Sequence, residues 1–232
     1  MGKFGWLIAS GALIFLIALA FYSASTSSGP SLAGEPWSQE TLKGDDEAPN
    51  KVTYYTDITC PHCAKFHLAS VEGDAFDKEY IKTGKVQMEV RVTAMLQGKS
   101  VNSARAGESA YCAISQGKFY EYYDEIVAKL DEDYFSKDIG TSPMGPAIPQ
   151  LDDEYYIAAA DKAGLDKEGM KNCLDSNEMQ GAIQESTQKA AQQLPYGAGV
   201  PYFIVNDFTT SGFGGGYDTV KQLMEAGGIK GD

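Results

Sequence analysis

Residues 53–67 of the chain read TYYTDITCPHCAKFH. The first half of this stretch is rich in β-branched and aromatic residues, which predicts a strand over residues 51–58. Cys60 and Cys63 follow directly, and Pro61 between them suits the first turn of a helix, because a helix start leaves its first N–H groups unpaired in any case. We expect that helix over about residues 61–70. A CxxC pair therefore lies where a strand ends and a helix begins.

A CxxC pair in this position favours redox chemistry over two alternatives. A cysteine attacks a disulfide as its thiolate, and the helix N-terminus at Cys60 stabilises that anion. His62 favours the thiolate further when it is protonated or donates a hydrogen bond, and Cys63 lies one turn into the helix. A zinc site usually needs four ligands, and the local candidates are Cys60, His62, Cys63 and His67. Adjacent residues such as His62 and Cys63 converge poorly on one ion. A purely structural disulfide is the other alternative. We expect no metal and no cofactor.

The rest of the chain frames this junction with a second β region and a long helical region. Residues 86–95, VQMEVRVTAM, alternate as a strand does, and residues 98–193 are helical and polar in pattern. Strand patterns return at PYFIVN, residues 201–206, and a helix is expected over residues 217–226. This order predicts an α/β fold in which a helical domain is inserted between two β-containing halves.

The N-terminal residues indicate export. Residues 6–22 are uncharged and apolar, a length between that of a signal-peptide core and that of a membrane-spanning helix. Lys3 precedes them and no further Lys or Arg occurs before Lys43, which orients the N-terminus toward the cytoplasm. Residues 1–22 are thus an uncleaved single-pass anchor in the cell membrane or a cleaved signal of a secreted or periplasmic protein. Residues 23–49, rich in Ser, Gly, Pro and acidic residues, are expected to be a flexible tether.

The charge balance excludes one class of partner. The 232 residues carry a net charge of −13, with a pI near 4.6. Nucleic-acid phosphates require Lys and Arg, so this balance argues against nucleic-acid binding. It also disfavours broad docking to an anionic membrane surface.

Taken together, these residues resemble the DsbA family of thioredoxin-fold thiol oxidoreductases. The resemblance covers about residues 50–228. It is carried by CPHC at 60–63, GESAYCAISQGKFYEYYDEIV at 107–127, AAADKAGLDKEGMKNCLDS at 158–176 and GAGVPYFIVN at 197–206. It implies a thioredoxin-like fold over residues 50–232, with the helical insertion at about 98–193.

The resemblance also implies a reaction and its residues. Cys60 would be attacked by a substrate thiolate, Cys63 would be the buried partner, and Pro61 and His62 between them would tune the couple. A cis bond between Val200 and Pro201 would leave the Val200 backbone free to pair with an extended substrate. The implied partners are unfolded or folding exported proteins and a membrane quinone-linked reoxidase. We expect a monomer.

Tyr54 departs from the family pattern. It stands six residues before Cys60, where relatives of the enterobacterial oxidant often carry a buried acid. A phenol is a weaker proton acceptor near neutral pH than a carboxylate. Asp57 lies nearer the motif but, by strand alternation, need not occupy the same site.

Cys112 and Cys173 match positions where the resembling sequences commonly carry cysteine. In an oxidising compartment two such cysteines pair, although two separate buried thiols are the alternative. Phe119, with the tyrosines at 120, 122 and 123, forms an aromatic run that we interpret as packing, with a substrate groove as the alternative.

Three functions compete for the chain. The first is an oxidase that introduces disulfide bonds into exported proteins, and the second is a reductase or isomerase of the same fold. The third is a non-catalytic module that uses the CxxC to bind a metal or a partner. A redox potential separates them, since a strong oxidant lies near about −120 mV and a reductase near about −270 mV.

Overall fold

The computed structural model describes residues 40–71, 75–206, 208–211 and 217–230. The chain divides into two compact units, Met1–Glu35 and Pro36–Asp232, and all described residues belong to the second unit. The segment 6–22, expected to be an anchor or signal, lies outside the described residues.

The predicted single-pass location at the cell membrane is corrected. Within the described ranges no helix is both long enough and apolar enough to cross a bilayer. The longest of these helices, α5 (Phe119–Asp133), has 15 residues, whereas a spanning helix needs about 20 apolar ones. Its sequence FYEYYDEIVAKLDED is also strongly charged. The predicted single-pass location therefore finds no support in the described residues, and the segment 6–22 on which it was based lies outside them.

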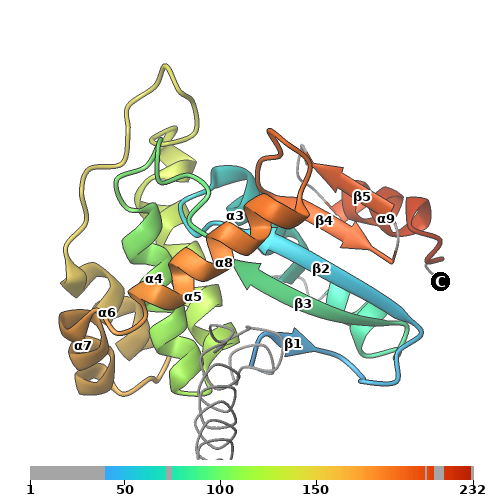
Figure 1. The fold of residues 1–232 in the computed structure, drawn as a ribbon, viewed down its shortest axis with the longest axis horizontal. Coiled ribbons are helices and arrows are strands. Elements are labelled where there is room, and N and C mark those ends of the chain that lie inside the picture. The colour runs from blue at the N-terminus through green and yellow to red at the C-terminus, as the bar shows by residue number, and fades with distance from the viewer. Residues whose placement is uncertain (1–39, 72–74, 207, 212–216, 231–232) are drawn as a thin grey trace, which may run out of the picture. The chain divides into compact units, whose positions relative to one another are not determined.

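A five-stranded mixed sheet forms the centre of the domain, in the order β1-β3-β2-β4-β5 (Figure 1). The strands β2 and β3 run parallel, which requires the crossover through α3, and the remaining neighbours are antiparallel. The strands are β1 (Leu42–Lys43), β2 (Asn50–Thr56), β3 (Val86–Val92), β4 (Tyr202–Val205) and β5 (Phe208–Ser211).

Most of the helices come from one part of the sequence. Five α-helices lie between β3 and β4, and Figure 1 shows α4 to α7 gathered beside the sheet, with α8 leading back toward it. Within that group Asp152 and Asp166 cap the starts of α6 and α7 by accepting backbone N–H groups. The remaining bounds are α3 (Pro61–Val71), the π-helix η1 (Asp77–Ile81), α4 (Ser103–Ser115), the 3-10 helix η2 (Phe135–Lys137), α6 (Asp153–Lys162), α7 (Lys167–Ser176), α8 (Gln180–Gln193) and α9 (Tyr217–Ala226).

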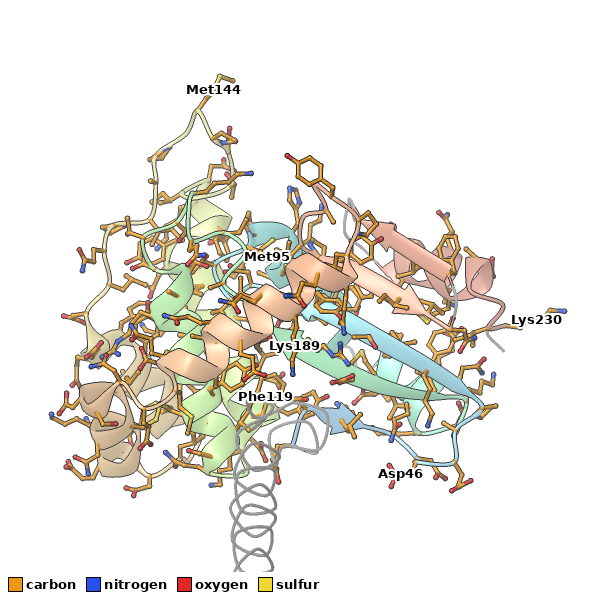
Figure 2. All side chains as sticks on the ribbon, viewed as in Figure 1. Asp46, Met95, Phe119, Met144, Lys189 and Lys230 are labelled. Atoms are coloured by element: carbon orange, nitrogen blue, oxygen red, sulfur yellow. A yellow bond between two sulfur atoms is a disulfide. The ribbon has the colours of Figure 1, made fainter. Side chains whose placement is uncertain are left out.

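A loop joins η2 to α6, and it contains the prolines of residues 141–150. Figure 2 shows Met144 at the outer end of this loop, where its side chain is 97% exposed. Proline lacks the backbone N–H that a continuing helix needs, so the helical pattern stops here.

The two faces of the sheet are covered by different helices. Tyr54 of β2 stacks on Phe203 of β4 and meets the edge of Phe66 of α3, with ring centroids 4.8 Å apart in both cases. The next residue, Tyr55, lies in a second cluster with Ala190 of α8 and with Leu194, which directly follows that helix. Successive side chains of a strand point to opposite faces, so β2 is buried on both sides. The junction that carries the cysteines is thereby held between two layers of helix.

The end of the segment expected to be a tether belongs to the domain instead. Residues 42–43 form β1, which pairs antiparallel with β3. Thr41 is buried and accepts a hydrogen bond at its carbonyl from the Tyr120 hydroxyl, and Lys43 forms an ion pair with Asp77. These partners lie far along the chain, so composition alone did not reveal them. The tether predicted over 23–49 is corrected at its C-terminal end.

A disulfide joins Cys112 of α4 to Cys173 of α7. The S–S distance is 1.97 Å, the Cα atoms are 5.9 Å apart, and 61 positions separate the two residues. Both side chains are buried among the helices between β3 and β4. The bond therefore ties the first of these helices to the fourth.

Replacing Cys112 and Cys173 together by alanine is expected to lower the free energy of unfolding by about 4 kcal/mol, because the closed loop no longer restricts the unfolded chain. Urea unfolding of the double variant and the parent, both with Cys60 and Cys63 reduced, measures the difference. A loss below about 1 kcal/mol would contradict the chain-entropy argument for this loop.

Candidate active site

Cys60 is placed at the start of α3 by hydrogen bonds on both sides. Its N–H donates to the Asp57 carbonyl at 3.0 Å, and its own carbonyl accepts from the Ala64 N–H at 2.9 Å. The Cys60 Sγ accepts the backbone N–H of Cys63 at 3.3 Å, as a capping side chain does at a helix start. Cys60 and Cys63 are free thiols in the structure and both side chains are buried.

The pKa of Cys60 is lowered below that of an ordinary thiol. The main cause is a hydrogen bond from the Cys63 thiol, which favours the Cys60 thiolate, and the backbone N–H groups of Cys63 and His62 add to it. Burial and the negative charge of Asp57 act in the opposite direction. The balance favours the anion that attacks, and is attacked, in thiol–disulfide exchange.

The pKa of Cys63 is raised well above that of an ordinary thiol. Burial is the main cause, and the hydrogen bond to Cys60 and the Cys60 charge both raise it further. The Asp57 backbone N–H, and after it the Thr56 hydroxyl, oppose these effects by favouring the Cys63 thiolate. The two sulfurs are therefore unequal, with a reactive thiolate at Cys60 and a protonated partner at Cys63.

The loop before β4 meets the cysteines from the far end of the chain. The Val200–Pro201 peptide bond is cis, and the Cys60 Sγ lies 3.4 Å from the Val200 carbonyl oxygen, across 140 positions of sequence. Val200 is half-buried and Pro201 is buried. The structure thus brings together the two sulfurs and the Val200–Pro201 pair that the resemblance singled out.

The two residues between the cysteines are placed differently. Pro61 opens α3 and is half-buried. His62 supplies its backbone N–H to the Cys60 sulfur, while its side chain is exposed. In the structure His62 therefore acts on Cys60 through its backbone N–H. A sequence pattern does not distinguish this effect from an effect of the side-chain charge.

Asp57 ties the cysteine loop to the inserted helices. It is fully buried, and its Oδ1 accepts from the N–H and the hydroxyl of Thr59 at 2.9 and 2.8 Å. Its Oδ2 accepts from the Leu96 N–H at 2.9 Å and from the Ser103 hydroxyl at 2.6 Å. Burial raises the pKa of Asp57 and these hydrogen bonds oppose that shift. Sequence reasoning noticed Asp57 but not this role, because its partners are distant in the chain.

His67, named above only as a possible zinc ligand, packs against α5. It is buried, its ring meets the edge of Tyr123 at 4.5 Å, and its Nε2 lies 2.8 Å from an Asp124 carboxylate oxygen. The aromatic run of α5 is therefore shared between two neighbours, because Tyr123 packs against α3 whereas the Tyr122 hydroxyl bonds to Ser109 of α4. In the part of the chain that the structure describes, no group of three or more His, Cys, Asp and Glu side chains is arranged to hold a metal.

Tyr54 lies beneath Cys63 in the place where an acid was expected from the resembling sequences. Its hydroxyl lies 3.4 Å from the Cys63 carbonyl oxygen and 3.1 Å from Thr56 Oγ1. Burial is the main reason that its pKa is raised well above that of an ordinary phenol. Tyr54 therefore stays protonated near neutral pH and serves as a hydrogen-bond donor, not as a base.

Comparison with known proteins relates this site to a family. The family profile described as thioredoxin matches residues 38–222. A relative named probable disulfide bond formation protein D, from Bacillus anthracis, is 26% identical over 173 residues, which cover 73% of this chain and 71% of the relative. A protein of the same name from Bacillus cereus is 29% identical over 123 residues, covering 52% of this chain and 56% of the relative.

Solved structures agree on the fold. The oxidised form of BdbD from Bacillus subtilis superimposes with a TM-score of 0.64 at 20% identity, covering 85% of this chain and 95% of that one. DsbA from Chlamydia trachomatis does so with a TM-score of 0.59 at 15% identity, covering 80% and 89%. This likeness confirms the predicted thioredoxin-like fold with its helical insertion.

Brief alkylation of the reduced protein at mildly acid pH is expected to label Cys60 before Cys63. The lowered pKa of Cys60 keeps a thiolate there as the pH falls, whereas the raised pKa of Cys63 keeps a thiol. Peptide mass spectrometry after quenching measures both sites. A Cys60→Ala variant, which should stay unlabelled under the same conditions, is the control, and equal labelling of both cysteines in the parent would contradict the assignment.

Proposed function

The chain belongs to the thioredoxin family, and from that premise we propose that it is a thiol:disulfide oxidoreductase that introduces disulfide bonds into other proteins through Cys60 and Cys63. The observation that carries the proposal is the opposite pKa shift of two adjacent sulfurs at a helix start. The relatives named disulfide bond formation protein D support proteins as the substrate class.

The reaction begins on the oxidised couple. A substrate thiolate attacks Cys60 Sγ, a mixed disulfide forms, and the Cys60–Cys63 bond breaks with its electron pair on Cys63. A second substrate thiolate then attacks the substrate sulfur of the mixed disulfide and releases Cys60 as a thiolate. The substrate loses two electrons and the couple gains them. Of the two protons that the substrate thiols lose, one ends on Cys63 and the other enters the solvent.

The neighbours of the couple have proposed roles. The half-buried Val200, whose carbonyl lies beside the Cys60 sulfur, is the backbone edge against which an extended substrate would pair, and Pro201 fixes that edge. Pro61 and His62 set the start of α3, with the His62 N–H directed at the sulfur. The return of electrons from the reduced couple requires an acceptor. The family resemblance supports a quinone-linked membrane protein in that role.

The direction of the reaction follows from the Cys60 thiolate. A group whose folded pKa is lowered stabilises the folded protein above its unfolded pKa and loses that contribution as the pH falls through the folded pKa. At neutral pH the Cys60 thiolate therefore stabilises the reduced couple, whereas the disulfide contains no thiolate to be stabilised. A couple that is stable when reduced is a strong oxidant when oxidised, so we propose an oxidase rather than a reductase.

Equilibration of the Cys60–Cys63 couple with glutathione buffers is expected to give a potential nearer about −120 mV than about −270 mV, because the Cys60 thiolate stabilises the reduced form. The fraction of reduced protein, measured by alkylation at each buffer ratio, reports the value. A potential near the lower figure would support the reductase alternative, and a couple that never exchanges with glutathione would support a binding module.

Replacing Cys63 by serine is expected to trap substrate proteins on Cys60 as mixed disulfides, because no neighbouring thiol can then displace them. Non-reducing electrophoresis of the variant incubated with a reduced, unfolded protein should show the linked species, and a reductant should dissolve it. The matched variant is Cys60→Ser, for which no linked species is expected. Equal trapping by both variants would mean that the order of attack is wrong.

A further inference from the structure

Three hydroxyl groups lie buried on the inner side of Cys63. The Tyr54 hydroxyl lies 3.1 Å from Thr56 Oγ1, and the Tyr123 hydroxyl lies 2.8 Å from the same oxygen. Tyr54 and Thr56 come from β2, whereas Tyr123 comes from α5 of the insertion. All three side chains are at most 1% exposed, as is Cys63. We refer to Tyr54, Thr56 and Tyr123 as the hydroxyl triad.

Thr56 is the member of the triad that acts on Cys63. The Tyr54 hydroxyl, which donates to Thr56 Oγ1, also lies 3.4 Å from the Cys63 carbonyl oxygen, so the triad lies against Cys63. The Thr56 hydroxyl favours the thiolate form of Cys63 and lowers its pKa. A hydroxyl has one proton to give and two lone pairs to accept with. When both phenols donate to Thr56 Oγ1, the Thr56 proton is left for the Cys63 sulfur.

The contact between Thr56 and Tyr123 can run in either direction, since either oxygen can be its donor. With Cys63 as a thiol, its one proton is directed at Cys60, and the Thr56 proton can turn to Tyr123. With Cys63 as a thiolate, Tyr123 donates to Thr56, and the Thr56 proton turns to the sulfur. Burial raises the pKa of both phenols, so each keeps its proton to donate throughout the neutral range.

The two directions of the Thr56–Tyr123 hydrogen bond matter when the disulfide opens. The electron pair of the broken bond arrives on a sulfur that is buried away from water, and an unpaired buried anion is strongly disfavoured. Tyr54 stands where a carboxylic acid would supply a proton, and both oxygens of Asp57 already accept hydrogen bonds from other groups. The Asp57 backbone N–H and the Thr56 hydroxyl are thus the groups that meet the new charge, and of these two only the hydroxyl can reverse its hydrogen bond.

We propose that Thr56 is a catalytic residue that donates a hydrogen bond to the Cys63 sulfur as the disulfide opens, and that Tyr54 and Tyr123 are positioning residues that orient its hydroxyl. The proposal rests on the function proposed above. Thr56 keeps its proton throughout. The bond that forms joins the substrate sulfur to Cys60, the bond that breaks is Cys60–Cys63, and the proton that finally reaches Cys63 is one that the substrate thiols lose.

This role predicts a kinetic effect without an equilibrium effect. Cys63 carries a full or partial negative charge only while the disulfide opens or closes, because in the two end states it is a disulfide sulfur or a thiol. An interaction made only with the intermediate charge changes both rates by the same factor and leaves the equilibrium constant unchanged. A residue that only supports the fold would not produce this pattern.

The test measures how fast reduced glutathione opens the disulfide of the full chain and how fast the glutathione mixed disulfide closes again. Thr56→Val is expected to slow both steps by roughly 10-fold to 100-fold, the range for losing a hydrogen bond to a charged group. The equilibrium with glutathione should stay within about twofold of the parent, and Thr56→Ser should restore both rates because it restores the hydroxyl.

Two matched controls separate the triad from any buried hydroxyl. Thr93 is fully buried and its hydroxyl donates to the Thr56 carbonyl at 2.9 Å, so Thr93→Val removes a neighbouring hydroxyl that does not face the sulfur. Tyr122 precedes Tyr123 on α5 and is equally buried, but its hydroxyl lies 2.7 Å from Ser109 Oγ. We expect Tyr123→Phe to slow opening, although less than Thr56→Val does, and Tyr122→Phe and Thr93→Val to leave the rates unchanged.

Each outcome counts for or against the proposed role of Thr56. Opening by Thr56→Val at the parent rate would overturn the proposal, and so would equal slowing by the two controls or an equilibrium shift as large as the rate change. Should Thr56→Val not fold, Tyr123→Phe against Tyr122→Phe decides, with equal rates counting against the triad. A parent protein that does not exchange with glutathione would instead overturn the proposed function, and this inference with it.

Discussion

The hydrogen bond between the two thiols of Cys60 and Cys63 is the interaction on which the site depends. It is the largest cause of the lowered pKa of Cys60, and it exists only while Cys63 keeps its proton. Cys63 keeps that proton because α3 packs its inner face onto the sheet and removes the sulfur from water. The reactivity of one sulfur is therefore a consequence of the burial of the other, and the stacked rings around Tyr54 that seat α3 on the sheet serve the chemistry as well as the fold.

Asp57 shows how position and reactivity oppose each other in this site. Its charge raises the pKa of Cys60, yet its carboxylate fixes the loop that presents Cys60 and connects that loop to the start of α4 through Ser103. Four hydrogen bonds draw its charge toward Thr59, Leu96 and Ser103 and away from the sulfur. The insertion is thus joined to the site by hydrogen bonds as well as by packing. Its disulfide braces the helices that carry this attachment.

Local patterns predicted the strand, the helix start and the CxxC at their junction, because each depends on neighbours within a few residues. They did not reveal that β1 completes the sheet, nor that Tyr123 meets Thr56 across 67 positions of sequence. Helical periodicity marks Tyr122 and Tyr123 alike as packing residues, and only the angle at which α5 meets α3 decides which of them reaches the cysteines. The family resemblance, not a local pattern, indicated that the Val200–Pro201 pair belongs to the site of Cys60.

Neutral hydroxyls beneath Cys63 fit the charge already present in this site. Asp57 raises the pKa of Cys60, and a second buried carboxylate under Cys63 would place another negative charge beside the same two sulfurs. That charge would work against the Cys60 thiolate in the resting reduced state, when no help is needed at Cys63. A hydroxyl is uncharged at rest and can reverse its hydrogen bond when charge arrives. An uncharged Tyr54 in place of an acid is therefore compatible with exchange chemistry, provided that a hydroxyl close to the Cys63 sulfur stabilises the negative charge there when the disulfide opens.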